Sequence, residues 1–464
     1  MTITTFSTAR RVQLATCLGF FVVLMDVSVV NVALQALHLA FDARVTDLQW
    51  VINAYGLMFS SLLLLAGSLG DRLGAKPVFM AGFGVFSLAS LGCGIAASLE
   101  ALIAWRLAQG LGAALLVPTS LALLQQAFTD SSARQRAVGW WGAGGGIALA
   151  AGPVVGGLLI ETLGWRSLFF INLPVGLMGL WLTARHAPRA AAQPQRSLDV
   201  PGQVSGALAL GALTFALTQA SQLGWQHPLI LTAALAFVAL GGLFVWLQGN
   251  RPTAMLPPGL FRTAAVASAT CIGLLANLVF YGMVFTLSLY FQTVRHLSAE
   301  ATGVAFLPMM GVLMVMNVIA GRVLGRMGAR ALATTGLLIS AAGYGLMIAG
   351  LSAPSLTPLV VPMLLAGSGI ALIVPTITSA TLTAVGASHA GVASGVLNSA
   401  RQVGGIVGVA VFGYLLREGV MLGVERALGV SVVVLVVAAG VAFTGLGANP
   451  TRAIPAADKV PRRL

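Results

Sequence analysis

Charged side chains are scarce in this sequence. Only 8% of its 464 residues are Asp, Glu, Lys or Arg, whereas an ordinary soluble domain carries about 25%. Because so few charges cannot solvate the surface of a globular domain of this size, a water-soluble fold is excluded. Disorder is excluded as well, since 58% of the residues are hydrophobic. The composition predicts a polytopic membrane protein.

Cysteine and histidine are also rare. The three cysteines lie in apolar runs without a CxxC pair and the five histidines are scattered, so neither a disulfide framework nor a metal or redox centre is expected. A membrane-embedded enzyme would need clustered histidines or acids at one interface, and a channel-like subunit would need several ionisable residues in mid-helix. Both classes stay as distant alternatives. The sequence also lacks a Walker-type GxxxxGK[ST] motif, so nucleotide-driven transport is not expected.

Long apolar runs make up most of the chain. A membrane helix needs about 20 mostly apolar residues, and charged or Pro/Gly-rich breaks separate fourteen such runs. Helices are favoured over a β-barrel because the runs are continuously apolar and do not alternate. The predicted spans are residues 12–40, 48–70, 77–98, 101–127, 136–160, 167–184, 203–221, 229–248, 264–291, 302–321, 331–350, 357–384, 392–416 and 427–447.

The positive charges orient these spans. A formal net charge of +13 would suggest nucleic-acid binding in a soluble protein, but in a membrane protein no nucleic-acid partner is expected. With a cytoplasmic N-terminus and fourteen crossings, 18 of the 25 Lys and Arg fall on the cytoplasmic side and 5 on the outer side. This is the bias of the positive-inside rule. Both termini are therefore expected in the cytoplasm, and Arg106 and Arg401 remain within apolar runs.

An internal repeat divides the chain. The stretch Gly67–Lys76 (GSLGDRLGAK) matches Gly321–Arg330 (GRVLGRMGAR) at five positions without gaps, with Gly325 opposite Asp71. Two parallel halves related in this way are typical of transporters whose site lies between the halves. We expect an N-terminal six-helix half, a cytoplasmic linker, two additional helices, a C-terminal six-helix half and a cytoplasmic tail at residues 1–185, 186–202, 203–250, 251–448 and 449–464.

Six stretches carry a resemblance to a known family. They are Met25–Leu34 (MDVSVVNVAL), Gly67–Lys76, Arg106–Ala114 (RLAQGLGAA), Gly152–Gly157 (GPVVGG), Trp165–Pro174 (WRSLFFINLP) and Gly395–Gly405 (GVLNSARQVGG). In this order they resemble the major facilitator superfamily and, more closely, its fourteen-spanner drug:proton antiporters of the EmrB/QacA type. Gln35 replaces the Pro that usually follows the first stretch. The resemblance implies an all-α major facilitator fold with 14 transmembrane helices (6 + 2 + 6) in two pseudo-symmetric halves.

Asp26 is the most informative single residue. It lies 15 residues after Arg11 and 16 before Asp42, so about 22–24 Å of helix separates it from each, near the middle of the bilayer. An ionised carboxylate at that depth costs at least ~2.5–3.5 kcal/mol. Burial therefore favours the neutral form, and a proton carrier needs a group that can exist in both forms. The alternative is a carboxyl that only stabilises helix packing through a polar neighbour.

Arg106 is the second buried charge. It follows Glu100 by six residues, which places it about 9 Å into its helix and leaves about 6 Å of depth between it and Asp26. Its guanidinium is therefore expected to modulate the protonation of Asp26, a role that the resemblance also implies. The alternative is an arginine that snorkels to the surface or bonds local carbonyls.

Two glycine-containing motifs are expected to control the conformational change. By resemblance, Asp71 meets the start of the thirteenth helix near residues 388–391 when the cytoplasmic side is closed. Gly145, Gly152 and Gly156 share one stripe of their helix, which permits close helix contact near the outer face. The predicted latch is Gly67, Asp71, Arg72, Gly74 and Lys76, and the antiporter motif is Gly145, Gly152, Pro153, Gly156 and Gly157. The alternatives are plain topology charges for the first motif and ordinary GxxxG packing for the second.

The predicted substrate cavity takes polar and adaptable side chains from both halves. They are Asn31, Asn53, Tyr55, Gln109, Asn277, Tyr281, Met309 and Arg401. For most of them packing inside the membrane is the alternative, and for Arg401 it is snorkelling to the inner surface.

These features predict proton-coupled efflux of amphipathic, hydrophobic or cationic drug-like compounds by alternating access. Protons serve as the coupling ion, and no cofactor is expected. The alternative within transporters is a dedicated exporter of one endogenous metabolite or antibiotic. We expect a monomer in the cytoplasmic membrane of a bacterium, surrounded by lipid, and leave open a partner that spans the outer envelope.

Overall fold

All regular secondary structure in the described part of the chain is helical. The computed structural model describes residues 2–128, 130–188, 198–251, 254–256, 258–385 and 390–447. Most of the predicted linker, residues 388 and 389 of the predicted latch contact, and the predicted tail lie outside these ranges.

The helices follow one another with short connections. The α-helices are α1 Thr2–Val30, α2 Leu34–Phe41, α3 Val45–Leu73, α4 Ala75–Gly94, α5 Leu99–Ala127, α6 Ser131–Leu163, α7 Ser167–Phe170, α8 Asn172–His186, α9 Val200–Leu223, α10 Pro228–Asn250, α11 Ala264–Leu289, α12 Ala299–Ala305, α13 Leu307–Gly350, α14 Thr357–Val385, α15 Ala390–Leu415 and α16 Val420–Gly445. Four short helical turns join or extend them: η1 Asn31–Ala33, η2 Pro258–Arg262, η3 Tyr290–Val294 and η4 Leu416–Glu418.

Thirteen helical segments of the described chain are long and apolar enough to cross a membrane. The longest, α13, has 44 residues and would extend about 66 Å if straight, about twice the thickness of the hydrocarbon core. It is interrupted at Gly328, whose φ of 75° and ψ of 162° are not helical. The protein is thus a multi-pass membrane protein, and the total of fourteen crossings stays a prediction.

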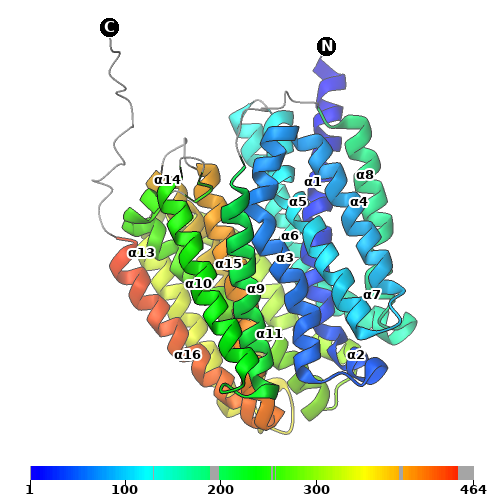
Figure 1. Ribbon diagram of the computed structural model, residues 1–464, viewed down its shortest axis with the longest axis vertical. Helices are drawn as coiled ribbons and strands as arrows, with labels where there is room; N and C mark the ends of the chain where they lie inside the picture. The colour runs from blue at the N-terminus through cyan, green and yellow to red at the C-terminus, as the bar shows by residue number, and fades with distance from the viewer. Residues whose placement is uncertain are drawn as a thin grey trace.

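The basic residues lie mainly at one end of the bundle. We call the end at which α1 begins, at the top of Figure 1, the upper end, and the opposite end the lower end. Described Lys and Arg near the upper end are Arg10, Arg11, Arg72, Lys76, Arg134, Arg136, Arg185, Arg251, Arg262, Arg322, Arg326 and Arg330. Those near the lower end are Arg44, Arg166, Arg295, Arg417 and Arg426.

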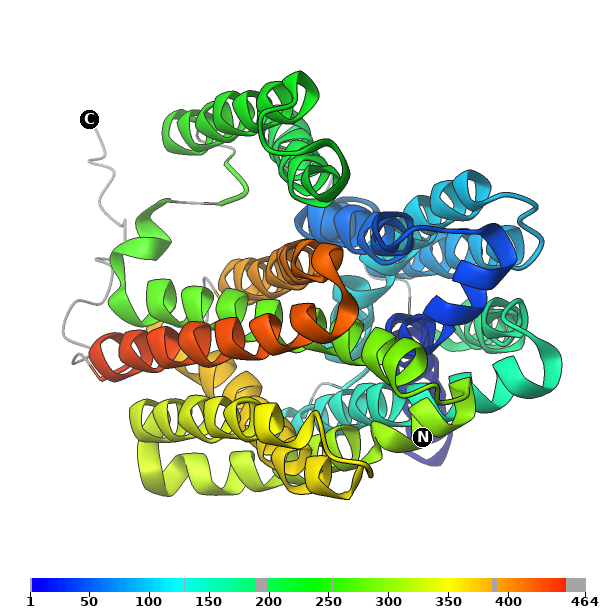
Figure 2. The same cartoon turned by 90° about the horizontal axis from the view of Figure 1, so that it is seen from below.

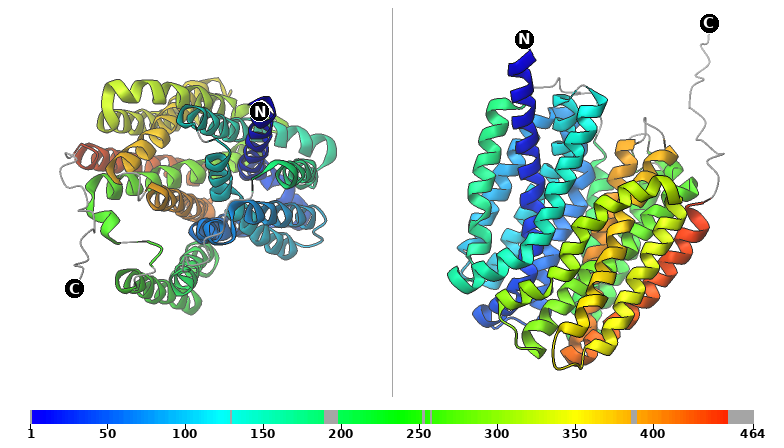
Figure 3. Two further views of the ribbon diagram at one scale, coloured as in Figure 1. Left: turned by 90° about the horizontal axis from the view of Figure 1, so that it is seen from above. Right: turned by 180° about the vertical axis from the view of Figure 1, so that it is seen from behind.

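Two groups of helices meet at the lower end. Helices α1 to α8 form the first group and α11 to α16 the second, and they lean apart toward the upper end (Figure 3). The apolar core of the second group continues into lower-end residues of the first, including Leu34, Leu48 and Val51. The first group has a separate core around Phe79 and Phe83. The lower end is therefore the closed end of the seam between the groups.

The hairpin of α9 and α10 lies outside both groups (Figure 2). Helix α9 packs against α3 of the first group and α15 of the second. Polar contacts hold it to α3 along its length: Gln203 donates to the Ser61 carbonyl, and the hydroxyls of Thr46 and Ser221 are 3.2 Å apart. The hairpin thus covers the seam between α3 and α15.

Candidate functional site

The centre of the site is a fully buried ion pair between two helices of the first group. Asp26 of α1 is 0% exposed and Arg106 of α5 is 1% exposed, and Arg106 Nη1 donates to Asp26 Oδ2. Both charges lie inside the apolar span, where an unpaired charge is costly. Because each charge is the other's counter-ion, the pair can exist at this depth.

Gln109 closes the pair into a ring. It lies one helical turn after Arg106 on α5, accepts from Arg106 Nη1 at 2.7 Å through Oε1, and donates to Asp26 Oδ1 at 2.8 Å through Nε2. The neighbouring Gly110 allows the α3 backbone at Tyr55 to come so close that a Cβ at position 110 would collide with it. The short stretch from Arg106 to Gly110 therefore supplies both the polar groups and the close approach.

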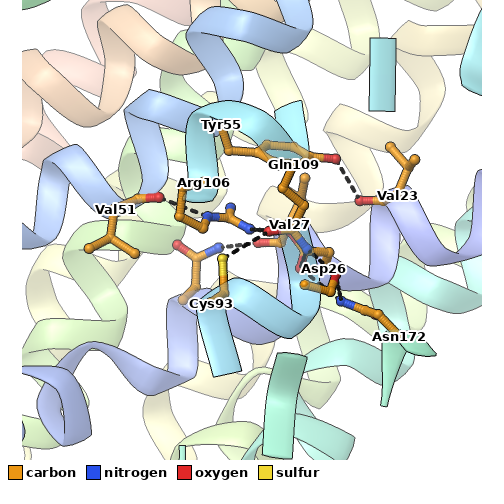
Figure 4. Close-up of polar contacts among 11 residues, drawn as sticks. Val23, Asp26, Val27, Val51, Tyr55, Cys93, Arg106, Gln109 and Asn172 are labelled. Atoms are coloured by element: carbon orange, nitrogen blue, oxygen red, sulfur yellow. Dashed lines mark hydrogen bonds and ion pairs between the residues drawn. The ribbon is translucent and has the colours of Figure 1, made fainter. Parts of the chain in front are cut away.

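Two further polar residues, Asn172 and Ser90, extend the network around the carboxylate, and Figure 4 shows Asn172 beside Asp26. Asn172 Nδ2, at the start of α8, donates to Asp26 Oδ1 at 3.1 Å and lies 3.3 Å from Ser90 Oγ of α4, which also accepts from Gln109 at 2.8 Å. The sequence prediction missed both residues as site residues. Asn172 had a signal, since it falls within the Trp165–Pro174 stretch, whereas one serine in an apolar helix gave none.

Arg106 connects this network to the seam between the groups. Its Nε donates to the Val51 carbonyl of α3 at 3.0 Å, and its Cζ lies 4.4 Å from the centre of the Tyr55 ring. A small cavity of about 40 Å³ lies beside it, enough for a few water molecules. Arg106 and Tyr55 line this cavity but Asp26 does not. The Asp26 carboxylate is therefore connected to this cavity through Arg106 and does not line it.

Three of the predicted cavity residues line the central cavity: Asn53 and Tyr55 of α3 and Tyr281 of α11. Gln402 and Gly405 of α15 line it as well, and both belong to the Gly395–Gly405 stretch that carries the family resemblance. Their positions three residues apart on one helical face are the signal that could have identified them. Both groups of helices thus contribute to the cavity wall.

The other predicted cavity residues have different surroundings. Asn31 donates to the Val27 carbonyl, and its own carbonyl accepts from Ser288 across the seam. Asn277 donates to the Gly273 carbonyl within α11 at 2.9 Å. Met309 is 0% exposed, with its backbone close to Gly367 of α14. Gln109 belongs to the Asp26 network.

Arg401 of α15 lies inside the second group. Its side chain packs against Gly273 of α11, a position that Ile377 of α14 also approaches. Nη1 lies 3.2 Å from Asn398 Oδ1, whereas Nε is buried without a hydrogen-bond partner. The next residue, Gln402, lines the central cavity. Arg401 is thus partly buried against α11 and α14, and it directly precedes a residue of the cavity wall.

The predicted latch forms the short connection between α3 and α4. Gly74 adopts a φ of 94°, which favours glycine, and ends α3. Lys76 Nζ donates to the carbonyls of Ala184 and Ala187 at 2.9 Å each, at the end of α8. This is a favourable place for a cation, because the last carbonyls of a helix lack partners. Gly67 faces Pro118 of α5, and Asp71 and Arg72 lie in the last turn of α3.

The repeat loop in the second group is built in the same way. Gly328 has a φ of 75°, and Arg330 Nε donates to the Phe443 carbonyl near the end of α16 while its guanidinium lies 4.5 Å from the Phe443 ring centre. In each group, therefore, the cation that ends the motif binds the last helix of its own group.

The glycines of the predicted antiporter motif face two different partners. Gly145, Gly152 and Gly156 lie against α1. A Cβ at the first two positions would collide with Phe20 and Ser28, and one at the third would be in tight contact with Val29. Gly157 instead faces the backbone of Ala299 and Glu300 of α12, in the second group. The Pro153 carbonyl lies against Gly303 of α12. The stripe thus packs within one group, whereas Gly157 and Pro153 close the lower end of the seam.

Comparisons with known proteins agree with this architecture. The family model described as Major Facilitator Superfamily matches residues 16–409. The chain is 38% identical over 400 residues to the methylenomycin A resistance protein of Streptomyces coelicolor, covering 86% of this chain and 84% of that protein. It is 35% identical over 405 residues to the multidrug resistance protein Stp of Mycobacterium tuberculosis, covering 87% and 75%.

A solved structure has the same fold. It is a bacterial homolog to the human lysosomal transporter Spinster in an inward-facing and unoccupied conformation, with a TM-score of 0.67 and 18% identity over 95% of this chain and 97% of that one. At that identity the likeness concerns the fold alone. The family match and the relatives' coverage lead to one conclusion: this chain belongs to the Major Facilitator Superfamily.

Proposed function

We propose that this protein exports drug-like or antibiotic molecules across the bacterial cytoplasmic membrane in exchange for protons. The observation that carries the proposal is the buried Asp26–Arg106 pair, whose cation lines the cavity between the two groups. The proposal includes the fourteen-spanner EmrB/QacA architecture, with α13 crossing twice around Gly328 and α9–α10 as the two additional helices.

The pair supplies a physical link between proton and substrate. While Asp26 is ionised, its charge neutralises Arg106 and the ring with Gln109 is intact. When a proton binds Asp26, Arg106 loses its counter-ion and the free energy of the buried cation rises. A change in the wall of the cavity is then favoured, because Arg106 also holds the Val51 carbonyl of α3. Proton binding and substrate binding can thereby alternate.

Alternating access follows from the asymmetry of the seam. The structure has a closed lower end, where Gly157 and Pro153 of α6 meet α12. With the basic upper end in the cytoplasm, as the positive-inside rule favours, this conformation accepts substrate from inside the cell. A proton crossing the membrane contributes about 2.3 kcal/mol per 100 mV, which sustains a substrate gradient of about 50-fold. The monomer in lipid needs no cofactor for this cycle.

The relatives favour two substrate ranges. One is named for resistance to many drugs, which supports broad export. Another is named for methylenomycin A, a single antibiotic, and this supports the alternative of a dedicated antibiotic exporter. The wall of this small cavity combines the apolar Ile406 with the rings of Tyr55 and Tyr281 and with polar side chains. Such a mixed lining suits an amphipathic molecule in either case, once the two groups of helices move apart to make room for it.

Transport into everted vesicles with an imposed pH gradient tests the proposal. We expect the wild type to accumulate members of a drug and antibiotic panel, and Asp26→Asn to lose at least tenfold of the proton-driven flux. Asp199→Asn is the matched control. Asp199 is a buried carboxyl at the start of α9 that accepts a hydrogen bond from Gln248 near the end of α10, and it belongs to neither group of helices. Equal proton-driven flux in wild type and Asp26→Asn would remove the ion pair from the mechanism. Flux of one compound only would select the dedicated exporter.

A further inference from the structure

The two arginines that lie within apolar helices, the buried Arg106 and the partly buried Arg401, differ in their counter-ions. Arg106 has Asp26, but no carboxylate among the described residues pairs with Arg401. Its contacts are the neutral Asn398 at 3.2 Å and the packing against α11, and its Nε has no partner. Since a guanidinium stays protonated in proteins, this charge cannot be removed by deprotonation.

The distribution of acids explains why no internal partner is available. The described part of the second group contains Glu300, Glu418 and Glu425, all near the lower end. Arg401 is twelve residues into α15, which begins at the upper end, so about 17 Å of helix separates it from that end. Its helical side chain also points toward the upper end.

The surroundings at the upper end of the second group are positive. Arg262 precedes α11, and the described charges of α13 near this end are all basic: Arg322, Arg326 and Arg330. Charges of one sign around an opening raise the local concentration of oppositely charged solutes. An anion that enters from the upper end therefore meets an attractive field and reaches the cavity wall at Gln402. The neighbouring residue in the chain is Arg401, whose Nε is buried without a hydrogen-bond partner.

We propose that Arg401 is the anion-binding residue of the transported substrate, which carries a carboxylate or a comparable acidic group on an apolar body. This inference rests on the proposed export function and replaces the expectation of cationic substrates. The acidic group accepts from the Arg401 guanidinium, and the apolar body lies between the two groups of helices, next to Tyr281 and Gln402, where the groups separate to admit it. When the upper end closes and water leaves, the bound anion supplies the counter-ion that the protein lacks. Closing is thus favoured for the loaded transporter.

Three dansyl compounds with one fluorescent body and three charges test this assignment. Dansylglycine is an anion, dansylglycinamide is neutral and dansylcadaverine is a cation at neutral pH. Binding to the purified full-length protein in phosphatidylcholine nanodiscs is read as energy transfer from tryptophan. We expect dansylglycine to bind the wild type about tenfold to hundredfold more tightly than the amide, the range of a hydrogen bond to a charged group. Dansylcadaverine should bind most weakly.

Variants at position 401 identify the residue. Arg401→Gln should remove the preference for the acid and change the affinity for the amide less than about twofold, whereas Arg401→Lys should keep part of the preference. Arg426→Gln is the matched control, because Arg426 pairs with Glu418 at the lower end. If Arg401→Gln does not fold, the preference of the wild type for dansylglycine over the amide, and its partial retention in Arg401→Lys, still test the inference. Equal binding of acid and amide by the wild type, binding of none of the three, or an unchanged preference in Arg401→Gln would overturn the inference.

Two further measurements separate the possible sources of the anion and the two proposals. Adding phosphatidylglycerol to the nanodiscs should leave dansylglycine binding unchanged, and its loss would assign Arg401 to a lipid headgroup instead of a substrate. In everted vesicles, proton-driven export of dansylcadaverine but not of dansylglycine would overturn the anion inference and leave the export function standing. Selective binding of dansylglycine without any proton-driven flux would support the anion inference and overturn the proposed proton-driven export.

Discussion

The two groups of helices share a scaffold but differ in their buried charges. At the upper end, each group has a glycine with positive φ followed two residues later by a cation that binds its last helix: Gly74 with Lys76, and Gly328 with Arg330. In the interior, the first group contains a neutralised Asp26–Arg106 pair, and the second contains Arg401 without a carboxylate partner in the described chain. The two groups thus share the loop contacts that stabilise the fold, but they differ in the charged side chains of their interiors.

The largest effect is expected from Asp26→Asn. The substitution leaves Arg106 as an unpaired cation within the bilayer, so we expect a loss of about 3–5 kcal/mol of unfolding free energy. Denaturant unfolding in mixed micelles, followed by tryptophan fluorescence, measures it. Asp199→Asn serves again as the control and should lose less, because its partner Gln248 is neutral. A loss no larger than that of the control would mean that the pair contributes little to stability.

A double-mutant cycle sharpens this result. Arg106→Gln alone leaves Asp26 without its cation, whereas Asp26→Asn together with Arg106→Gln removes both charges and retains groups that can form hydrogen bonds. We therefore expect the double variant to be more stable than the sum of the single losses predicts, by about 2–3 kcal/mol. The same unfolding measurement gives this coupling energy. Additive losses would indicate that the two residues act independently.

The opposite sign is expected at Arg401. Because this cation lacks a counter-ion among the described residues, Arg401→Gln should stabilise the substrate-free protein by about 1 kcal/mol or more. The unfolding measurement is made without ligand in zwitterionic lipid and detergent. A destabilisation as large as that of Asp26→Asn would erase the contrast between the two groups and indicate a structural role for Arg401.

The smallest effects are expected at the matched loops. Lys76→Met and Arg330→Met each remove a cation from the terminal carbonyls of α8 or α16, and each should cost about 1 kcal/mol of unfolding free energy. The two losses should be similar and should add in the double variant, since the sites lie in different groups. Thermal unfolding of the two single variants and the double variant checks this. A large loss at one loop only would show that the two repeat loops do not contribute equally to stability.

Much of this comparison could be predicted from the sequence. The repeat loops were visible by residue matching, and the helical depths of Asp26 and Arg106 placed them near each other before any contact was known. The family assignment and the membrane-spanning helices followed from six stretches and the apolar runs, and the family match confirms the superfamily.

Other features depend on side-chain directions that spacing along the chain does not give. Ser90 and Asn172 join the Asp26 network from two other helices, and Asp26 itself is separated from the cavity by Arg106. Hydropathy identifies a span but not the face that it turns toward its neighbours. For the same reason the stripe of Gly145, Gly152 and Gly156 could be predicted, but its partner α1 could not.

The hairpin of α9 and α10 gives the molecule two unlike sides. It lies over the α3–α15 seam and is held to α3 by Gln203, while the α6–α12 seam is on the other side of the bundle (Figure 2). A hydrophobic solute that diffuses within the bilayer therefore meets the α9–α10 hairpin on one side of the bundle and the uncovered contact between α6 and α12 on the other. A substrate that enters from the membrane would therefore pass between the groups on the α6–α12 side, which Pro153 and Gly157 close at the lower end.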